Sequence, residues 1–138
     1  MKIVVFDTNV LLDLFVFNDF RALHLKQALI DGKIDALASP KTLEEFADVI
    51  ARPIFALSTE QRQQISLQWQ GLARVIPDEA LTTAPWVCQD PDDQVFLDLA
   101  YTNKPCTLVS KDNDVLRFEK KAANDQVLVT ADYKLAAL

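Results

Sequence analysis

The sequence predicts an α/β fold, specifically a three-layer α/β/α sandwich around a mainly parallel central sheet. Short apolar runs that suit buried strands alternate with helical patterns of about 10–15 residues. Strands connected in this way pair in parallel through right-handed crossovers, which place helices on both faces of the sheet. The chain has 138 residues, of which 50% are hydrophobic and 25% are charged. We therefore expect one globular domain over residues 1–138.

Five apolar runs have the length and composition of strands. The first run ends abruptly at Asp7, and the fourth leads into Ser110. The stretch 78–89 has an irregular pattern and is interrupted near its start and middle by Pro77 and Pro85, so we expect a loop there. The predicted strands are residues 3–6, 34–38, 74–77, 107–109 and 127–129, followed by a short tail over 133–138.

Capping residues delimit the helices between these strands. Asp19 can begin the second helix, and Gly32 can end it in a left-handed conformation. Ser39 followed by proline marks the start of the third helix, and Ser58 opens a capping-box pattern for the fourth. The predicted helices are residues 10–17, 19–31, 40 to just before 53, 59 to about 71 and 90 to about 103.

The net charge of −6 argues against a protein that coats nucleic acid through a basic stripe. Clustered carboxylates account for much of this charge, and divalent cations bound to them would reverse the local field at a phosphate group. Nucleic acid therefore stays open as a substrate. No apolar stretch approaches the roughly 20 residues of a membrane span, and the chain begins directly with a strand pattern. We expect a cytoplasmic protein without membrane contact.

The thiol and imidazole groups do not indicate a metal centre. Cys88 and Cys106 are expected to stay thiols in a reducing compartment. A structural zinc site is not expected, because the chain has one histidine and no C-x-x-C spacing. His24 lies in a helical pattern between two leucines, where an ordinary helix side chain is the simpler interpretation than a ligand or base.

Acidic residues recur at the ends or flanks of elements that are distant in sequence. Asp7 follows the first strand, where open α/β sheets bind ligands. In the third helix, Glu45 lies on the flank of the apolar face, whereas Glu44 points nearly opposite to it. Glu45 can therefore reach a cleft, although a solvated boundary residue is the simpler local interpretation.

The other two acidic segments also have a local explanation. Asp90 as an N-cap and Asp92 in the first turn suit helix capping and the helix dipole, which leaves Asp93 ambiguous. Asp112 and Asp114 could belong to an Asx-rich turn. A local turn does not explain, however, why four separate segments each carry an acidic residue at the end or flank of an element. Hard cations such as Mg²⁺ or Mn²⁺ prefer oxygen ligands and retain water, so carboxylates on separate elements suit them.

Four blocks of sequence, in this order and spacing, resemble the PIN domain over essentially the full chain. Within that family the chain is most similar to the toxins of bacterial toxin–antitoxin systems. The blocks are Val4 to Leu11 with the run Asp-Thr-Asn, Ser39 to Glu45 with Arg52-Pro53, Asp90 to Asp93 with Phe96, Leu97 and Ala100, and Leu108 to Asp114.

The resemblance implies a metal-dependent ribonuclease that uses Mg²⁺ or Mn²⁺ and is held by a protein antitoxin. It favours a functional role for Asp93, which the local pattern leaves ambiguous. The family often has threonine where this chain has Ser110, which keeps the hydroxyl. The family's acidic positions fall on Asp7, Glu45, Asp93, Asp112 and Asp114, with Asn9 and Ser110 as polar supports. The expected metal ligands are Asp7, Asp93, Asp112 and Asp114, and Glu45 is expected to act as a ligand or to orient the attacking water.

Other functions remain open from the sequence. An aspartyl-phosphate phosphatase also begins with a strand ending in aspartate, but it needs a second acid at the position of Asn9. A binding module with an inert pocket and a housekeeping RNA-processing nuclease are further alternatives, and a homodimer is open. Phe15, Phe17 and Phe20 could form an apolar groove for an antitoxin, although core packing is the simpler interpretation.

Overall fold

The computed structural model describes residues 1–138 and contains one five-stranded sheet in which every strand pairs in parallel. The strand order is β3-β2-β1-β4-β5. The predicted parallel α/β fold is thus confirmed. The strands are β1 (Lys2–Phe6), β2 (Ile34–Ala38), β3 (Arg74–Val75), β4 (Cys106–Val109) and β5 (Val127–Thr130).

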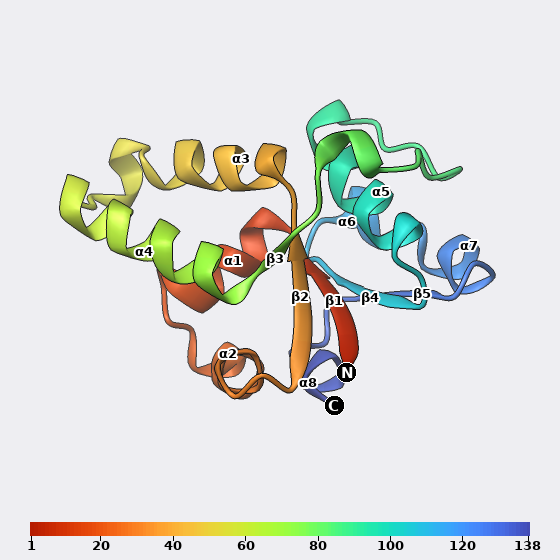
Figure 1. Ribbon diagram of the computed structural model, residues 1–138, viewed down its shortest axis with the longest axis horizontal. Coiled ribbons are helices and arrows are strands. Elements are labelled where there is room, and N and C mark those ends of the chain that lie inside the picture. Colours follow the sequence, from red (N-terminus) through yellow and green to blue (C-terminus); the bar gives the residue numbers. More distant parts are fainter.

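Helices cover both faces of the sheet, as Figure 1 shows. One layer contains α1 (Thr8–Phe15), α2 (Leu23–Ile30), α3 (Pro40–Ile50), α4 (Thr59–Leu72) and α8 (Tyr133–Ala137). The opposite layer contains α5 (Gln94–Thr102), α6 (Asn113–Leu116) and α7 (Glu119–Ala123). Four 3-10 turns lie between these elements: η1 (Phe20–Ala22), η2 (Pro53–Phe55), η3 (Asp78–Ala80) and η4 (Pro91–Asp93).

The alternation of side chains along β1 divides the core into two parts. Val4 and Phe6 pack beneath the layer that contains α1, whereas Val5 packs beneath α5. Trp69 of α4 is fully buried and lies against the rings of Phe6 and Phe15, with centroids 5.9 and 5.8 Å apart. Burial on both faces explains why the strands appear in the sequence as continuous apolar runs.

The topology places one crevice at the carboxyl ends of the strands. The chain proceeds from β1 outward to β2 and β3, and then returns to build β4 and β5 on the other side of β1. The direction of strand order therefore reverses between β1 and β4. Open α/β sheets bind ligands at such a switch point, outside the carboxyl ends of the strands.

The caps predicted from the sequence are present. The Ser39 hydroxyl accepts a hydrogen bond from the backbone N–H of Thr42 (3.3 Å), and the Thr42 hydroxyl oxygen accepts one from the backbone N–H of Ser39 (2.9 Å). Ser58 and Gln61 form the same reciprocal pair at the start of α4. Gly32 ends the α2 segment with φ of 72°, a conformation that L side chains rarely adopt.

The observed local structure differs from the predicted elements in three places. Asp19 and Asp90 cap the 3-10 turns η1 and η4, and the α-helices begin only after these turns. Residues 113–123 contain α6 and α7, which were not predicted, and the short tail, to which no secondary structure was assigned, contains α8. These helices have four or five residues each, too few for a helical period to be visible. They exist because Val115, Ala122 and Ala136 are buried against the sheet layers.

The three phenylalanines near the N-terminal helices do not share one environment. Phe15 belongs to the core, as the simpler interpretation predicted. Phe17 and Phe20 are 57% and 77% exposed, so that interpretation was wrong for them. His24 is an exposed side chain of α2, and Cys88 and Cys106 are buried free thiols. No helix combines the length and the apolar composition that crossing a membrane requires.

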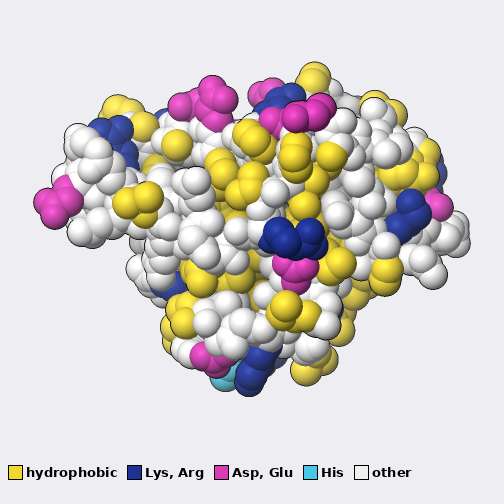
Figure 2. All heavy atoms as spheres, in the orientation of Figure 1, with side chains coloured by type: hydrophobic (Ala, Val, Ile, Leu, Met, Phe, Trp, Pro, Cys, Tyr) yellow, Lys and Arg dark blue, Asp and Glu magenta, His cyan; other side chains and the backbone are white.

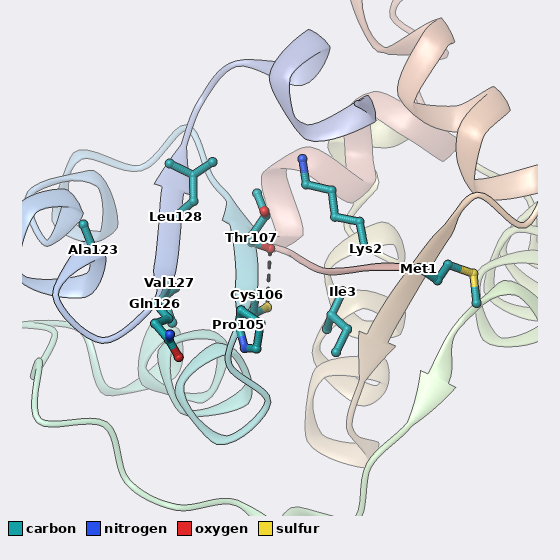
Figure 3. Close-up of a pocket in the computed structure, with 10 residues that line it drawn as sticks. All are labelled: Met1, Lys2, Ile3, Pro105, Cys106, Thr107, Ala123, Gln126, Val127 and Leu128. Carbon is teal, nitrogen blue, oxygen red and sulfur yellow. Dashed lines mark hydrogen bonds between the residues drawn. The ribbon is translucent and has the colours of Figure 1, made fainter.

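A cavity of about 570 Å³ lies at the amino ends of the strands (Figure 3). It is lined by the first residues of β1, β4 and β5, among them Ile3, Thr107 and Leu128. The predicted acids follow the opposite ends of β1 and β4. The chemistry expected from the sequence therefore belongs to the other edge of the sheet.

Candidate active site

Two neighbouring strands, β1 and β4, bring Asp7 next to the segment 110–114. The backbone N–H of Asp7 donates to the carbonyl of Val109 (3.0 Å), which continues the ladder between these strands. The buried Ser110 hydroxyl donates to Oδ2 of Asp7 (2.6 Å) and accepts from the backbone N–H of Asp112 (3.0 Å). The Ser110 hydroxyl therefore connects the carboxylate of Asp7 to the backbone of Asp112.

The Asp112 carboxylate continues this chain of hydrogen bonds. Its Oδ1 accepts from the backbone N–H of Asp114 (2.9 Å), so Asp112 is the N-cap of α6. The turn that seemed to compete with a functional role is thus part of the geometry that holds Asp112 beside Asp7. Asp114 is half-buried, and its carbonyl accepts a long contact from the thiol of Cys88 (3.7 Å).

Asp7 is a buried carboxyl group whose surroundings shift its pKa in opposite directions. Burial raises its pKa, and the charge of Asp112 raises it further. The hydrogen bond from Ser110 and the backbone N–H groups of Thr8 and Asn9, at the start of α1, act in the opposite direction. The side chain of Asn9 is exposed and has no hydrogen bond, so its supporting role stays a prediction beyond this backbone contribution.

The helix α3 directs Glu45 toward the same edge of the sheet. Its capping box holds the helix start at the end of β2, and Phe46, Val49 and Ile50 bury its inner face. Glu45 is half-buried on the flank of this face, whereas Glu44 is exposed, as the helical wheel predicted. Burial raises the pKa of Glu45, and the charges of Asp7 and Asp92 raise it further.

The turn η4 adds Asp93 from a third direction. The Asp90 side chain accepts from the backbone N–H of Asp92 (2.9 Å), so Asp90 caps this turn rather than the start of α5. Asp93 is half-buried, and burial together with the charge of Asp7 and a hydrogen bond to Asp112 raises its pKa to about 7. Asp93 therefore interacts with Asp7 and Asp112, the carboxylates that follow β1 and β4, which local sequence patterns could not indicate.

Cys88 marks the other side of this group of acids. Burial raises the pKa of its thiol to about 11, and the charges of Asp93, Asp112 and Asp114 contribute in the same direction. Asp114 therefore lies near the same carboxylates, although its own backbone contact is to Cys88. A thiol whose pKa is this high stays protonated and is a poor metal ligand.

Sequence reasoning missed two residues at this edge, Thr8 and Lys41. The Thr8 hydroxyl is buried without a hydrogen-bond partner of ordinary length, although it lies close enough to Glu45 to lower the pKa of that carboxyl group. Its position directly after Asp7 was the available signal. Lys41 contributes a cation to a cleft of about 370 Å³ that also contains Glu45, Asp92 and Arg52.

The surface reflects this mixture of charges. In Figure 2, acidic side chains gather along the rim above α3 and where α3 faces η4, with lysine and arginine atoms among them. No three carboxylate, thiol or imidazole groups converge as a preformed site for one ion. The carboxylates instead lie near one another in pairs and destabilise one another's ionised forms.

We expect the metal-free protein to lose stability as the pH rises from about 4 to about 8. Asp7, Glu45 and Asp93 have raised pKa values in the folded state, so the folded state retains protons that the unfolded state has lost. The contribution of these groups to the free energy of unfolding is fully present below the pKa values of the unfolded state. It is lost as the pH rises through the pKa values of the folded state. Melting curves in a chelator should show a fall of about 2–4 °C, since solvent screens the half-exposed Asp93.

Two adjacent substitutions separate this effect from general charge. Asp93→Asn should flatten the pH dependence of the melting temperature, because it removes the group whose pKa is near 7. Asp92→Asn removes the same charge at an exposed position and should retain more of the wild-type slope than Asp93→Asn, because the charge of Asp92 acts only indirectly, by raising the pKa of Glu45. Equal slopes in Asp93→Asn and the wild type would contradict the expectation.

Comparisons with known proteins identify the family and a similar fold. A family model described as the PIN domain matches residues 3–114. The crystal structure of VapBC2 from Rickettsia felis, bound to a DNA fragment from its promoter, has a similar fold with a TM-score of 0.62. The sequence identity is 12%, and the match covers 94% of this chain and 98% of that chain. A comparison with curated protein sequences finds no significant match. Because the family model spans most of the chain and all four acidic segments, the protein belongs to the PIN-domain family.

Proposed function

We propose that residues 1–138 form a single nuclease domain that hydrolyses RNA with Mg²⁺ or Mn²⁺. PIN domains are in general nucleases. The observation that carries the proposal is the group formed by Asp7, Glu45, Asp93 and Asp112, which come from separate segments. Burial, and after it the charges of the other members, raises the pKa values of Asp7, Glu45 and Asp93. Repulsion of this kind lowers stability, so its presence at a switch point of the sheet favours a functional role.

The donor set suits a hard divalent cation. It offers carboxylate oxygens, and the neighbouring thiol of Cys88 has a raised pKa that disfavours ligation. Mg²⁺ commonly binds one or two carboxylates and retains several waters, so it does not need a preformed group of three side chains. The buried Thr8 hydroxyl without a partner is a further oxygen at this place. Asp7, Asp93, Asp112 and Asp114 would hold the ion.

Within this proposal the side chains have distinct tasks. A bound divalent ion supplies charge neutralisation at the phosphate and a more acidic water. Ser110 holds Oδ2 of Asp7 in place through its hydrogen bond of 2.6 Å. Asp112 is held by its cap and by Ser110. Glu45 is free to bind the ion or to orient the attacking water, since its carboxylate has no hydrogen bond of ordinary length to the protein. Because the acids interact, they titrate as a set.

A cleavage assay tests the proposed activity. The purified protein should cut single-stranded RNA in millimolar Mg²⁺ or Mn²⁺ and should stop when a chelator is added. The same assay with the Asp7→Asn protein controls for contaminating ribonuclease. Cleavage that persists in the chelator at the wild-type rate would contradict a metal-dependent mechanism.

We expect Mg²⁺ or Mn²⁺ to stabilise the metal-free protein. An ion that binds only the folded carboxylates shifts unfolding by mass action, by about 2.7 kcal/mol at 100 times the dissociation constant. Melting temperatures in chelator and in metal measure this shift. Asp93→Asn should reduce it, whereas the exposed neighbour Asp92→Asn should not. An unchanged melting temperature of the wild type in millimolar metal would contradict a shared ion site.

We further propose that the protein is a cytoplasmic toxin held by a protein antitoxin. The solved structure of similar fold is a VapBC2 complex, and apolar side chains are exposed along the α1–α2 connection and beside α3. Phe17 stacks near Phe55 with ring centroids 5.9 Å apart, and Phe20 and Ile54 are also exposed. Growth arrest on expression, relieved by a co-expressed neighbouring gene, would distinguish a toxin from a housekeeping nuclease. A homodimer stays open.

A further inference from the structure

We propose that the cavity between α5 and the loop 76–90 binds a guanine base of the RNA, next to the carboxylates. The inference rests on the proposed ribonuclease function and names its base-recognition site. The cavity has a volume of about 500 Å³, within the range of small-molecule sites. It shares the lining residues Lys41 and Val95 with the cleft that contains Glu45, so the two hollows are neighbours.

One wall of the cavity is held rigid by a row of side chains on α5. The backbone N–H groups of Thr82, Ala84 and Cys88 donate to side-chain oxygens of Thr102, Asp98 and Gln94 at 2.8 Å each. These three acceptors are spaced four residues apart and therefore lie on one face of the helix. The loop that seemed irregular in sequence is thus bound to α5 along its length. A preformed wall reduces the entropy lost when a ligand binds.

The walls combine apolar surface with unused hydrogen-bond acceptors. Leu81, Val87, Pro91 and Val95 provide apolar contacts for the faces of a base. Oδ1 of Asp78, another lining residue, is buried and has no hydrogen-bond partner. Asp98 uses its Oδ1 for the N–H of Ala84 and for Gln94, which leaves its Oδ2 without a hydrogen bond.

This pattern of groups complements guanine better than the other bases. The Watson–Crick edge of guanine presents two adjacent donors, the N1–H and the 2-amino group, beside the O6 acceptor. The carboxylates of Asp78 and Asp98 and the exposed cation of Lys41, which all line the cavity, supply two acceptors and one donor for these three groups. Adenine, cytosine and uracil each offer fewer donors on that edge, so they would leave an acceptor unpaired.

The position of the cavity relative to the acids is also suitable. Pro91 belongs to the turn that carries Asp93, and Cys88 lies near Asp93, Asp112 and Asp114. A base seated in the cavity would therefore place its own nucleotide beside the carboxylates. Recognition of a single unpaired base is the usual way in which proteins read RNA sequence.

The binding test uses nucleoside 5′-monophosphates in the absence of divalent metal, followed by NMR of backbone amides. GMP, IMP, AMP, CMP and UMP share one phosphate, so differences in affinity report the base. We expect GMP to bind at least about fivefold more tightly than AMP, CMP or UMP, with shifts at the amides of Ala84 and Cys88. IMP lacks the 2-amino group and should be intermediate. Equal affinities for the five nucleotides would overturn the proposal.

A matched pair of variants isolates the free oxygen of Asp98. Asp98→Asn keeps the acceptor for Ala84 and Gln94 but replaces Oδ2 with a donor, so the preference for GMP over AMP should disappear. Asp31→Asn is the control, because Asp31 accepts from Gln27 four residues earlier (2.8 Å) just as Asp98 accepts from Gln94. The control should retain the preference. If both variants behave alike, the proposal is wrong.

Two further measurements keep the test decisive. If Asp98→Asn fails to fold, the exposed substitution Lys41→Gln should lower the preference for GMP at least about threefold, and an unchanged preference would overturn the proposal. Arginine methyl ester that binds the cavity in place of GMP would also overturn it, since this result indicates a peptide side chain as occupant. If the protein cleaves RNA but shows no preference for GMP, the proposed base site is wrong and the proposed nuclease function is unaffected. If the protein prefers GMP but cleaves no RNA, the proposed nuclease function is wrong and the base site is unaffected.

Discussion

Replacing Asp7 by asparagine is expected to lower metal-dependent RNA cleavage at least about 1000-fold, which corresponds to about 4 kcal/mol of transition-state stabilisation. The substitution removes the charge of the carboxylate that lies deepest in the group of acids, while the shape of the side chain is kept. The asparagine oxygen can still accept the hydrogen bond from Ser110. Cleavage rates in Mn²⁺ measure the loss.

The same variant should keep or gain stability in the absence of metal. Burial raises the pKa of Asp7, so its ionised form is disfavoured in the folded protein and a neutral amide removes that cost. Asp13 provides the control, because this buried acid is paired with Lys111 (2.7 Å) and Tyr133 (2.6 Å). Asp13→Asn should lower stability by about 1–2 kcal/mol.

Stability and activity together therefore decide the role of Asp7. A fully active Asp7→Asn protein would remove Asp7 from the site. A large loss of stability in this variant would indicate that the carboxylate is structural, as Asp13 is. Only the combination of lost activity and retained stability agrees with a carboxylate kept for binding a cation.

Glu45→Gln and Glu44→Gln form the second test with a large expected effect. The two residues are adjacent on α3, so helix propensity and net charge change equally in both variants. Glu45 is half-buried and its pKa is raised by burial and by the charge of Asp7, whereas Glu44 is exposed. We expect a loss of at least about tenfold in cleavage rate for Glu45→Gln, or about 1.4 kcal/mol, and almost none for Glu44→Gln.

The comparison is informative because both proteins should fold equally well. Melting temperatures of the two variants should agree within a few degrees. Equal losses of activity, or a larger loss for Glu44→Gln, would indicate that Glu45 is a solvated boundary residue without a catalytic task. Binding of RNA by the inactive protein separates a loss of affinity from a loss of rate.

The sequence determined the features that depend on neighbouring residues. The strands are visible because burial on both faces demands continuous apolar runs. The starts of α3 and α4 are visible because a cap is a local interaction between Ser39 and Thr42 or between Ser58 and Gln61. The choice of Glu45 over Glu44 needed only the helical period and the apolar face beside it.

The tertiary structure decided the features that depend on distant residues. The helices α6, α7 and α8 are too short to be stable alone and form because the sheet layers bury one side of each. The loop after β3 is ordered by Asp98 and two further side chains of α5, an interaction across many residues that no local pattern reveals. Likewise, Asp7, Asp112 and Asp93 come together only because β1 and β4 pair in parallel and η4 lies beside their carboxyl ends, and electrostatic coupling depends on distance in space.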